Sequence, residues 1–168
     1  MQTGKFIVLL LLFAVTGAAW AIAQDPAPAE LKETALRDAA CANVDDSQVA
    51  ATVSAVAIRG GGRELGTIVA VQGACHCQSN NCDTLVYLRS GDGYRLAFRE
   101  RYASLHPMKV VKLGMPSLTG RLEVSGEKTE TTVYDWDGKR YRPSLCATVI
   151  KHAKIPSISR HPCRAPAR

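Results

Sequence analysis

Six cysteines that all lie downstream of an apolar N-terminal leader constrain this chain more than any other feature. The leader, Met1–Ala23, has one early cation at Lys5, an apolar run over Phe6–Val15 and small residues at Ala21–Ala23. This is the pattern of a secretory signal peptide, and we expect cleavage before Gln24. The cysteines then mature where disulfides persist, which predicts a disulfide-braced protein in a periplasmic or secreted location.

A retained leader would instead anchor the chain to a membrane. Thr16 and Gly17 interrupt its apolar stretch and a cleavage pattern follows, so removal is favoured. No later segment is apolar enough to span a bilayer, and we expect no integral membrane span after cleavage. Cleavage leaves 145 residues, an ordinary size for one domain with its own core.

Charge is distributed unevenly along the chain. The leader holds one of 21 basic residues and none of 15 acidic ones, so the mature chain carries +5. After Asp137 every charged side chain is cationic. Such a segment either attracts anionic partners or is simply a solvated basic tail. Nucleic acid is not expected as a partner, because few aromatic residues accompany the cations. The eight cations are Lys139, Arg140, Arg142, Lys151, Lys154, Arg160, Arg164 and Arg168.

Apolar periodicity predicts one helix followed by β-hairpins. Ala29–Ala42 has a helix-favouring composition with Leu31, Ala35 and Leu36 on one face. Asp-Gly pairs at residues 92–93 and 137–138 give the strongest hairpin signals. The expected strands are 52–58, 65–71, 84–88, 94–98, 110–113, 121–124, 131–136, 140–142 and 147–151, with the glycine-rich loop Arg59–Arg63 between the first two and a longer connection over 114–120.

These elements predict an α+β, mainly β fold. We expect the N-terminal helix to pack on one antiparallel sheet of about six to eight strands, built from hairpins and braced by disulfides. The predicted organisation is a signal peptide at residues 1–23, a linker at 24–28, a single β-rich domain with its N-terminal helix at 29–146, and a basic C-terminal segment at 147–168 tethered by Cys163.

The cysteine spacing allows several pairings. Six cysteines have 15 possible connectivities, so no pairing follows from the sequence alone. Our hypothesis is a local bridge between Cys77 and Cys82, a bridge between Cys146 and Cys163 that pins the basic segment, and a bridge from Cys41 to Cys75 that tethers the helix.

Val133–Pro143 carries a Trp-Asp-Gly-x-x-Tyr turn at residues 136–141. In these residues the chain resembles the closing hairpin of many small secreted bacterial proteins, some of them related to integrin-type propeller repeats. The Asp-x-Asp-x-Asp-Gly calcium segment of the propeller relatives is not present in this chain. The resemblance implies an extracytoplasmic β-rich domain and carries over no activity.

The densest group of metal-ligating residue types is Cys75, His76 and Cys77, followed by Cys82. Thiolates and imidazole at this spacing can bind zinc or copper. Cys75 and Cys77 would project to opposite sides of a strand, however, and an even number of cysteines in an oxidising compartment favours disulfides. We therefore expect no metal or cofactor and retain a metal-handling protein as an alternative.

The sequence contains no recognisable catalytic constellation. No serine lies in a Gly-x-Ser-x-Gly elbow. The acids Asp45, Asp46, Asp83 and Glu100 could supply a carboxylate pair for glycoside hydrolysis, but nothing in their spacing selects two of them. A protein without enzymatic activity is the prediction.

A rigid β surface can bind a macromolecule without the entropic cost of ordering a loop. We expect a binding protein, for example an inhibitor or immunity-type protein against an envelope hydrolase, and the charge of +5 favours an acidic one. The other alternative binds anionic envelope polymers through its basic C-terminal stretch. The candidate binding surface contains Arg59, Arg63, His76, Trp136, Tyr141 and Arg142.

Overall fold

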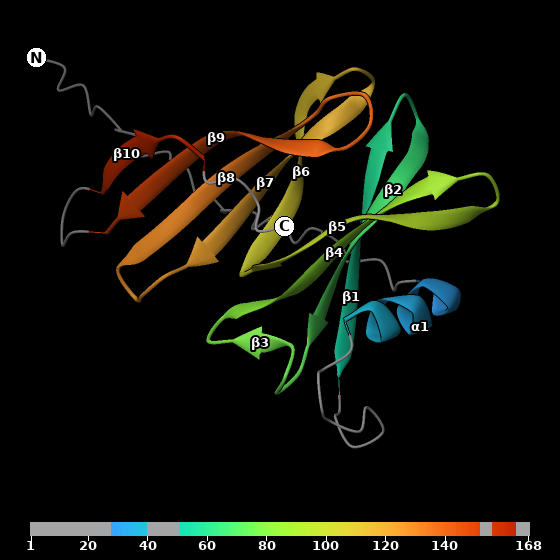
Figure 1. The fold of residues 1–168 in the computed structure, drawn as a ribbon, viewed down its shortest axis with the longest axis horizontal. Coiled ribbons are helices and arrows are strands. Elements are labelled where there is room, and N and C mark those ends of the chain that lie inside the picture. The colour runs from blue at the N-terminus through green and yellow to red at the C-terminus, as the bar shows by residue number, and fades with distance from the viewer. Residues whose placement is uncertain (1–27, 40–50, 152–155, 164–168) are drawn as a thin grey trace, which may run out of the picture.

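The computed structural model describes residues 28–39, 51–151 and 156–163. Within these ranges the protein is mainly β, with ten strands, one helix and antiparallel pairing throughout, which confirms the predicted fold class (Figure 1). The elements are α1 (Ala29–Asp38), β1 (Thr52–Gly60), β2 (Arg63–Gln72), β3 (Cys77–Gln78), β4 (Asn81–Ser90), β5 (Gly93–Tyr102), β6 (Ser104–Lys112), β7 (Met115–Glu123), β8 (Lys128–Trp136), β9 (Tyr141–Ile150) and β10 (Ser157–His161).

The strands form two five-stranded sheets rather than the single sheet predicted. The first has the order β1-β2-β4-β3, with β5 also paired to β4, and the second has the order β10-β9-β8-β7-β6. The chain passes from one sheet to the other at Ala103, whose N–H donates to the carbonyl of Arg121 at 2.8 Å. No glycine or proline marks residues 102–104, so the sequence gives no local signal for this change of sheet.

The first sheet lies between α1 and the second sheet (Figure 1). Its strands bury alternate residues on its two faces, which gives two separate apolar clusters. The cluster on the helix side contains Leu31, Ala35, Ala39, Val69, Val71, Leu85 and Tyr87. The cluster between the sheets contains Ile58, Ile68, Val86, Leu88, Tyr102, Leu105, Leu118 and Tyr141.

Three of the expected hairpins are confirmed as β1–β2, β4–β5 and β8–β9, and residues 147–151 largely continue β9. The predicted connection over residues 114–120 is wrong, because β7 begins at Met115. The chain turns instead at Leu113 and Gly114, both with positive φ (49° and 80°), as a tight hairpin requires. The sequence did not predict β10, because prolines flank it, and the structure leaves all five of its residues exposed.

Two of the proposed disulfides are confirmed. Cys77 is bonded to Cys82, and Cys146 is bonded to Cys163, just beyond β10. Cys75 is also disulfide-bonded, while its proposed partner Cys41 lies outside the described residues, as does the expected leader. The helix was predicted to reach Ala42, but α1 ends at Asp38 with Ala39 as its C-cap. The disulfide bonds are consistent with an oxidising compartment. Among the described helices, none has the length and apolar character that a membrane crossing requires.

Candidate functional site

Three hairpin ends meet at one end of the molecule, at the top of Figure 1. A methyl group placed on Gly60, in the β1–β2 turn, would lie 3.5 Å from the carbonyl oxygen of Gly114 in the β6–β7 turn. One placed on Gly138, in the β8–β9 turn, would lie 3.8 Å from Cδ1 of Leu113. We call residues 59–63, 110–114 and 135–142 the hairpin-end surface.

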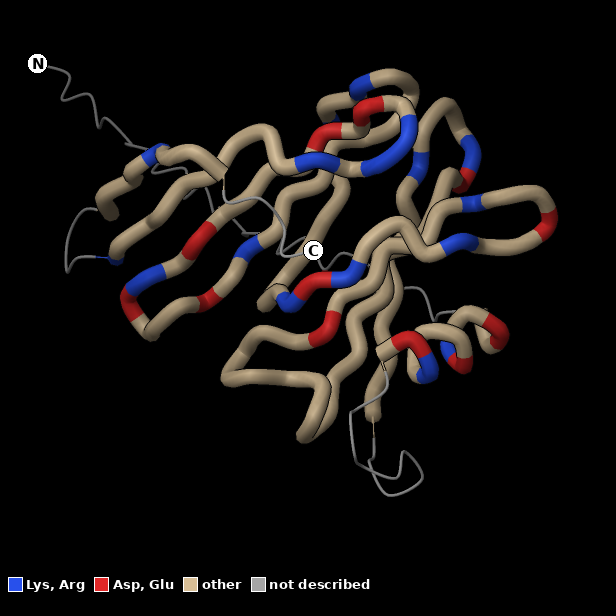
Figure 2. The backbone as a smooth tube through the Cα atoms, in the orientation of Figure 1, with Lys and Arg blue, Asp and Glu red and all other residues tan. Residues whose placement is uncertain are grey.

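Positive charge dominates the hairpin-end surface (Figure 2). Its segments contain two carboxylates, Asp135 and Asp137, against six cations. Asp135 accepts hydrogen bonds from Lys112 Nζ and, at 2.6 Å, from Ser117 Oγ, and these bonds hold the pKa of its carboxyl below the usual range. The cations are Arg59, Arg63, Lys112, Lys139, Arg140 and Arg142.

The third hairpin end is held by a second ion pair. Arg142 donates to the Asp137 carboxylate, which also accepts the backbone N–H groups of Lys139 and Arg140, each at 2.9 Å. The bond from Arg142, followed by those from the two backbone groups, lowers the pKa of Asp137. Both pairs restrain turns that would otherwise sample many conformations, so the surface is ordered before a partner arrives.

Exposed aliphatic side chains lie among these cations. Leu113 is 73% exposed, and Val110 and Val111 are 52% and 55% exposed. The sequence predicts a strand over residues 110–113; in the structure β6 ends at Lys112, and these residues lie at an outward hairpin end. Leu113 belongs to the tight turn that it forms with Gly114, and its side chain is left exposed there.

The hairpin-end surface contains three of the candidate binding residues, Arg59, Arg63 and Arg142, and all three are exposed. The two aromatic candidates, Trp136 and Tyr141, pack beneath the exposed residues of this surface. Trp136 is half-buried and packs on the Tyr141 ring, with centroids 5.2 Å apart. Tyr141 is buried and donates its hydroxyl to the Pro116 carbonyl at 2.9 Å, so it belongs to the core rather than to a contact face.

His76 does not lie on that surface, contrary to its inclusion among the candidates. Only 3% of the residue is exposed, and its Nδ1 lies 3.4 Å from Oδ2 of Asp83. The Asp83 N–H donates to the His76 carbonyl at 2.8 Å, a contact that folds residue 76 inward at the start of β4. Asp83 also accepts bonds from Arg99 at 3.1 Å and Arg101 at 3.3 Å, which stabilise a buried carboxylate.

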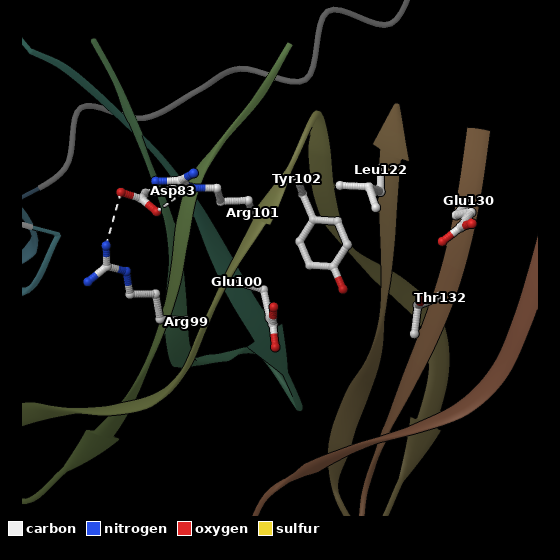
Figure 3. Close-up of a pocket in the computed structure, with 8 residues that line it drawn as sticks. All are labelled: Asp83, Arg99, Glu100, Arg101, Tyr102, Leu122, Glu130 and Thr132. Atoms are coloured by element: carbon white, nitrogen blue, oxygen red, sulfur yellow. Dashed lines mark hydrogen bonds and ion pairs between the residues drawn. The ribbon is translucent and has the colours of Figure 1, made fainter. Parts of the chain in front are cut away.

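A cleft of about 480 Å³ lies between β5 and β8 (Figure 3). Two of the acids considered for glycoside hydrolysis line it, but Asp83 faces Arg99 and Arg101 while Glu100 points to the other side of β5, toward Tyr102. Partial desolvation in the cleft raises the pKa of Glu100. The structure therefore does not bring these two acids together as a catalytic pair.

The proposed metal ligands are engaged elsewhere. Cys75, Cys77 and Cys82 are all disulfide-bonded, and the His76 ring faces Asp83. Within residues 28–39, 51–151 and 156–163, no group of three or more His, Cys, Asp or Glu side chains is arranged to hold a metal ion. Thiolate ligands are therefore not available in this oxidation state.

Comparisons with models of protein families, with curated proteins and with solved structures found no match to this chain.

Proposed function

We propose that this protein is an exported binding protein without enzymatic activity, which engages an acidic protein through the hairpin-end surface. The observation that carries the proposal is the meeting of three hairpin turns that surround an exposed leucine with cations. A concrete form is an inhibitor or immunity-type protein that blocks an acidic hydrolase of the cell envelope. Export is supported by the disulfides and by the leader pattern.

The chemistry of the surface favours a protein over an anionic polymer. A polymer of phosphate or carboxylate groups would neutralise the cations but offer little apolar area to cover Leu113 and Val111. Protein interfaces combine an apolar centre with a polar rim, and arginine is among the residues that anchor them. A cationic rim also favours encounter with an acidic partner through long-range attraction.

The basic C-terminal stretch supports the polymer alternative less directly. Part of it, β10, pairs with β9 and extends the second sheet, so it is not a free tail over that length. Lys154, Arg164 and Arg168 lie outside the described residues.

The test is retention and inhibition of acidic envelope hydrolases by the immobilised, oxidised protein. The double variant Arg63→Glu/Arg140→Glu reverses charge on two hairpin ends. Lys128→Glu, which reverses one charge next to the β7–β8 turn at the other end of the second sheet and breaks only the exposed Lys128–Glu130 pair, is the control. We expect wild type and control to retain and inhibit a hydrolase, and the double variant to bind at least about tenfold more weakly.

Two results would contradict the proposal. If no hydrolase in the panel is retained, the inhibitor form is wrong. If the double variant binds as tightly as the control, binding occurs but does not use the hairpin-end surface. Lower affinity at higher salt, with Lys128→Glu following wild type, would support the electrostatic part of the argument.

A further inference from the structure

A partly open pocket of about 230 Å³ lies between the two sheets, away from the hairpin-end surface. Along β1 the side chains of Ser54 and Val56 line it, Ile58 belongs to the apolar cluster between the sheets, and Arg59 begins the hairpin end. The cavity is therefore separated from the hairpin-end surface by packed core. Its other walls come from β2, β4 and the first residues of β6.

One buried polar atom beside this pocket has no hydrogen-bond partner among the residues that the structure describes. The Nδ1 atom of His106 is buried and makes no hydrogen bond within the described part of the chain. The half-buried Ser54 and Ser104 and the exposed Gln72 add hydroxyl and amide groups to the same lining. Buried polar groups are almost always bonded, so the orphaned imidazole nitrogen of His106 indicates an occupant that supplies a hydrogen bond there.

The lining also restricts the charge of that occupant. None of the thirteen lining residues is Asp, Glu, Lys or Arg. An ionised ligand would lose its hydration between the sheets without gaining a counter-ion, which is costly. Neutral ligands avoid this penalty.

One wall of the cavity is apolar, which restricts the ligand further. Val56, Ile68 and Leu105 line it together with Tyr102. A ligand that fits has an apolar face toward this wall and several hydroxyl or amide groups toward the polar side chains of the lining. Drug-sized ligands occupy pockets of about 300–1,000 Å³, so the cavity suits a single small ring.

We propose that the cavity between the sheets binds a neutral sugar unit of monosaccharide size. The sugar's hydroxyl or acetamido groups would bond to His106 Nδ1 and to the Ser54 and Ser104 hydroxyls, while one ring face packs against the apolar wall. This site is independent of the hairpin-end surface, and either can fail without the other.

The test is nuclear magnetic resonance of the isotopically labelled, oxidised protein titrated with five sugars. N-acetylglucosamine is the neutral probe, glucosamine the cationic one and glucuronic acid the anionic one; glucose and galactose extend the neutral set. We expect saturable shifts at Ala70, Ser104 and the His106 ring with a neutral sugar in the range of about 1 mM, and at least about tenfold weaker binding of both charged sugars.

Two variants locate the binding. Ala70→Leu adds bulk inside the cavity, and Ala74→Leu adds the same bulk at an exposed position in the turn after β2. We expect the first to abolish the shifts and the second to leave them unchanged. Ser104→Ala removes one hydroxyl without adding volume and should weaken binding about threefold to tenfold.

Three outcomes would overturn the proposal. The first is the absence of saturable shifts with every neutral sugar up to about 50 mM, which would mean that water alone occupies the cavity. The second is equal binding of the neutral and charged probes. The third is undiminished binding by a folded Ser104→Ala variant together with shifts that do not map to the cavity.

Discussion

The two sheets differ in how much of their surface is covered. The first has α1 on one face and the second sheet on the other, and β4 is buried along most of its length. The second sheet is covered only in part, and all five residues of β10 are exposed. Burial is the main stabilising contribution in folding, so the first sheet holds most of the fold's stability.

The less covered sheet supplies most of the proposed binding surface. Two of the three hairpin ends, β6–β7 and β8–β9, belong to the second sheet. The Cys146–Cys163 disulfide and the Asp135 and Asp137 ion pairs restrain this less covered sheet. The molecule thus separates a buried, stabilising layer from an exposed layer that presents side chains.

Leucines from the two sheets should differ most clearly in stability. Leu85, on β4, is fully buried against α1, whereas Leu145, on β9, is 36% exposed. We expect Leu85→Ala to lower the free energy of unfolding by about 3 kcal/mol and Leu145→Ala by about 1 kcal/mol or less. Urea unfolding of both variants measures this, and equal losses would contradict the assignment of stability to the first sheet.

Removal of the Cys146–Cys163 disulfide should act mainly on the second sheet. The bond closes a loop with a sequence separation of 17, which corresponds to about 3 kcal/mol in the chain-entropy model and often less in practice. In the double variant Cys146→Ser/Cys163→Ser we expect β10 amides to lose protection from hydrogen exchange while those of β2 and β4 keep theirs.

A matched variant, Cys77→Ser/Cys82→Ser, opens the shorter bridge at the start of β4. It should leave β10 protection unchanged. If both double variants expose β10 equally, or if loss of the second bridge exposes β2 and β4 first, then the sheets unfold as one unit and the comparison fails.

Hairpins with glycine turns were predictable because their signal is local. Asp-Gly pairs and the glycine-rich Arg59–Arg63 loop fix turns by backbone chemistry, and the structure has β1–β2, β4–β5 and β8–β9 where those signals lie. The β6–β7 turn was misplaced because a leucine occupies a position of positive φ, where glycine or asparagine is usual.

Features that depend on distant contacts were not predictable. The change of sheet at Ala103 has no turn residues, and the meeting of Gly60 with Gly114 joins positions far apart in the chain. The candidate site was accordingly only half predicted. Its arginines were identified from residue type. The burial of Tyr141 follows from packing between the sheets, that of His76 from its contacts with Asp83, and the exposure of Leu113 from its place in a tight turn.

Acid should weaken the second sheet at the hairpin-end surface through Asp135. The pKa of its carboxyl is lowered in the folded state, so its contribution is fully present above the unfolded value of about 3.9 and is lost as the pH falls through the lower folded value. We expect Asp135→Asn to cost under about 1 kcal/mol near neutral pH, since solvent screens the pair, and less at acid pH. Urea unfolding near neutral pH and below the unfolded pKa measures the difference, and the same cost at both pH values would contradict it.

Substitution of Leu113 should have the smallest effect on stability, and it should separate an effect on stability from an effect on binding most clearly. Its φ of 49° is unfavourable for a bulky side chain by about 1 kcal/mol, a cost that asparagine tolerates better. We expect Leu113→Asn to raise the free energy of unfolding by about 0.5 kcal/mol and to weaken capture of an acidic partner at least about tenfold. Urea unfolding and the immobilised-protein assay measure the two quantities on one sample.

A more stable variant that binds like wild type would show that the leucine has no contact role, whereas loss of both stability and binding would mean that the side chain supports the turn. Only a gain in stability together with a loss of binding fits a leucine that occupies a strained, exposed position because it contacts a partner.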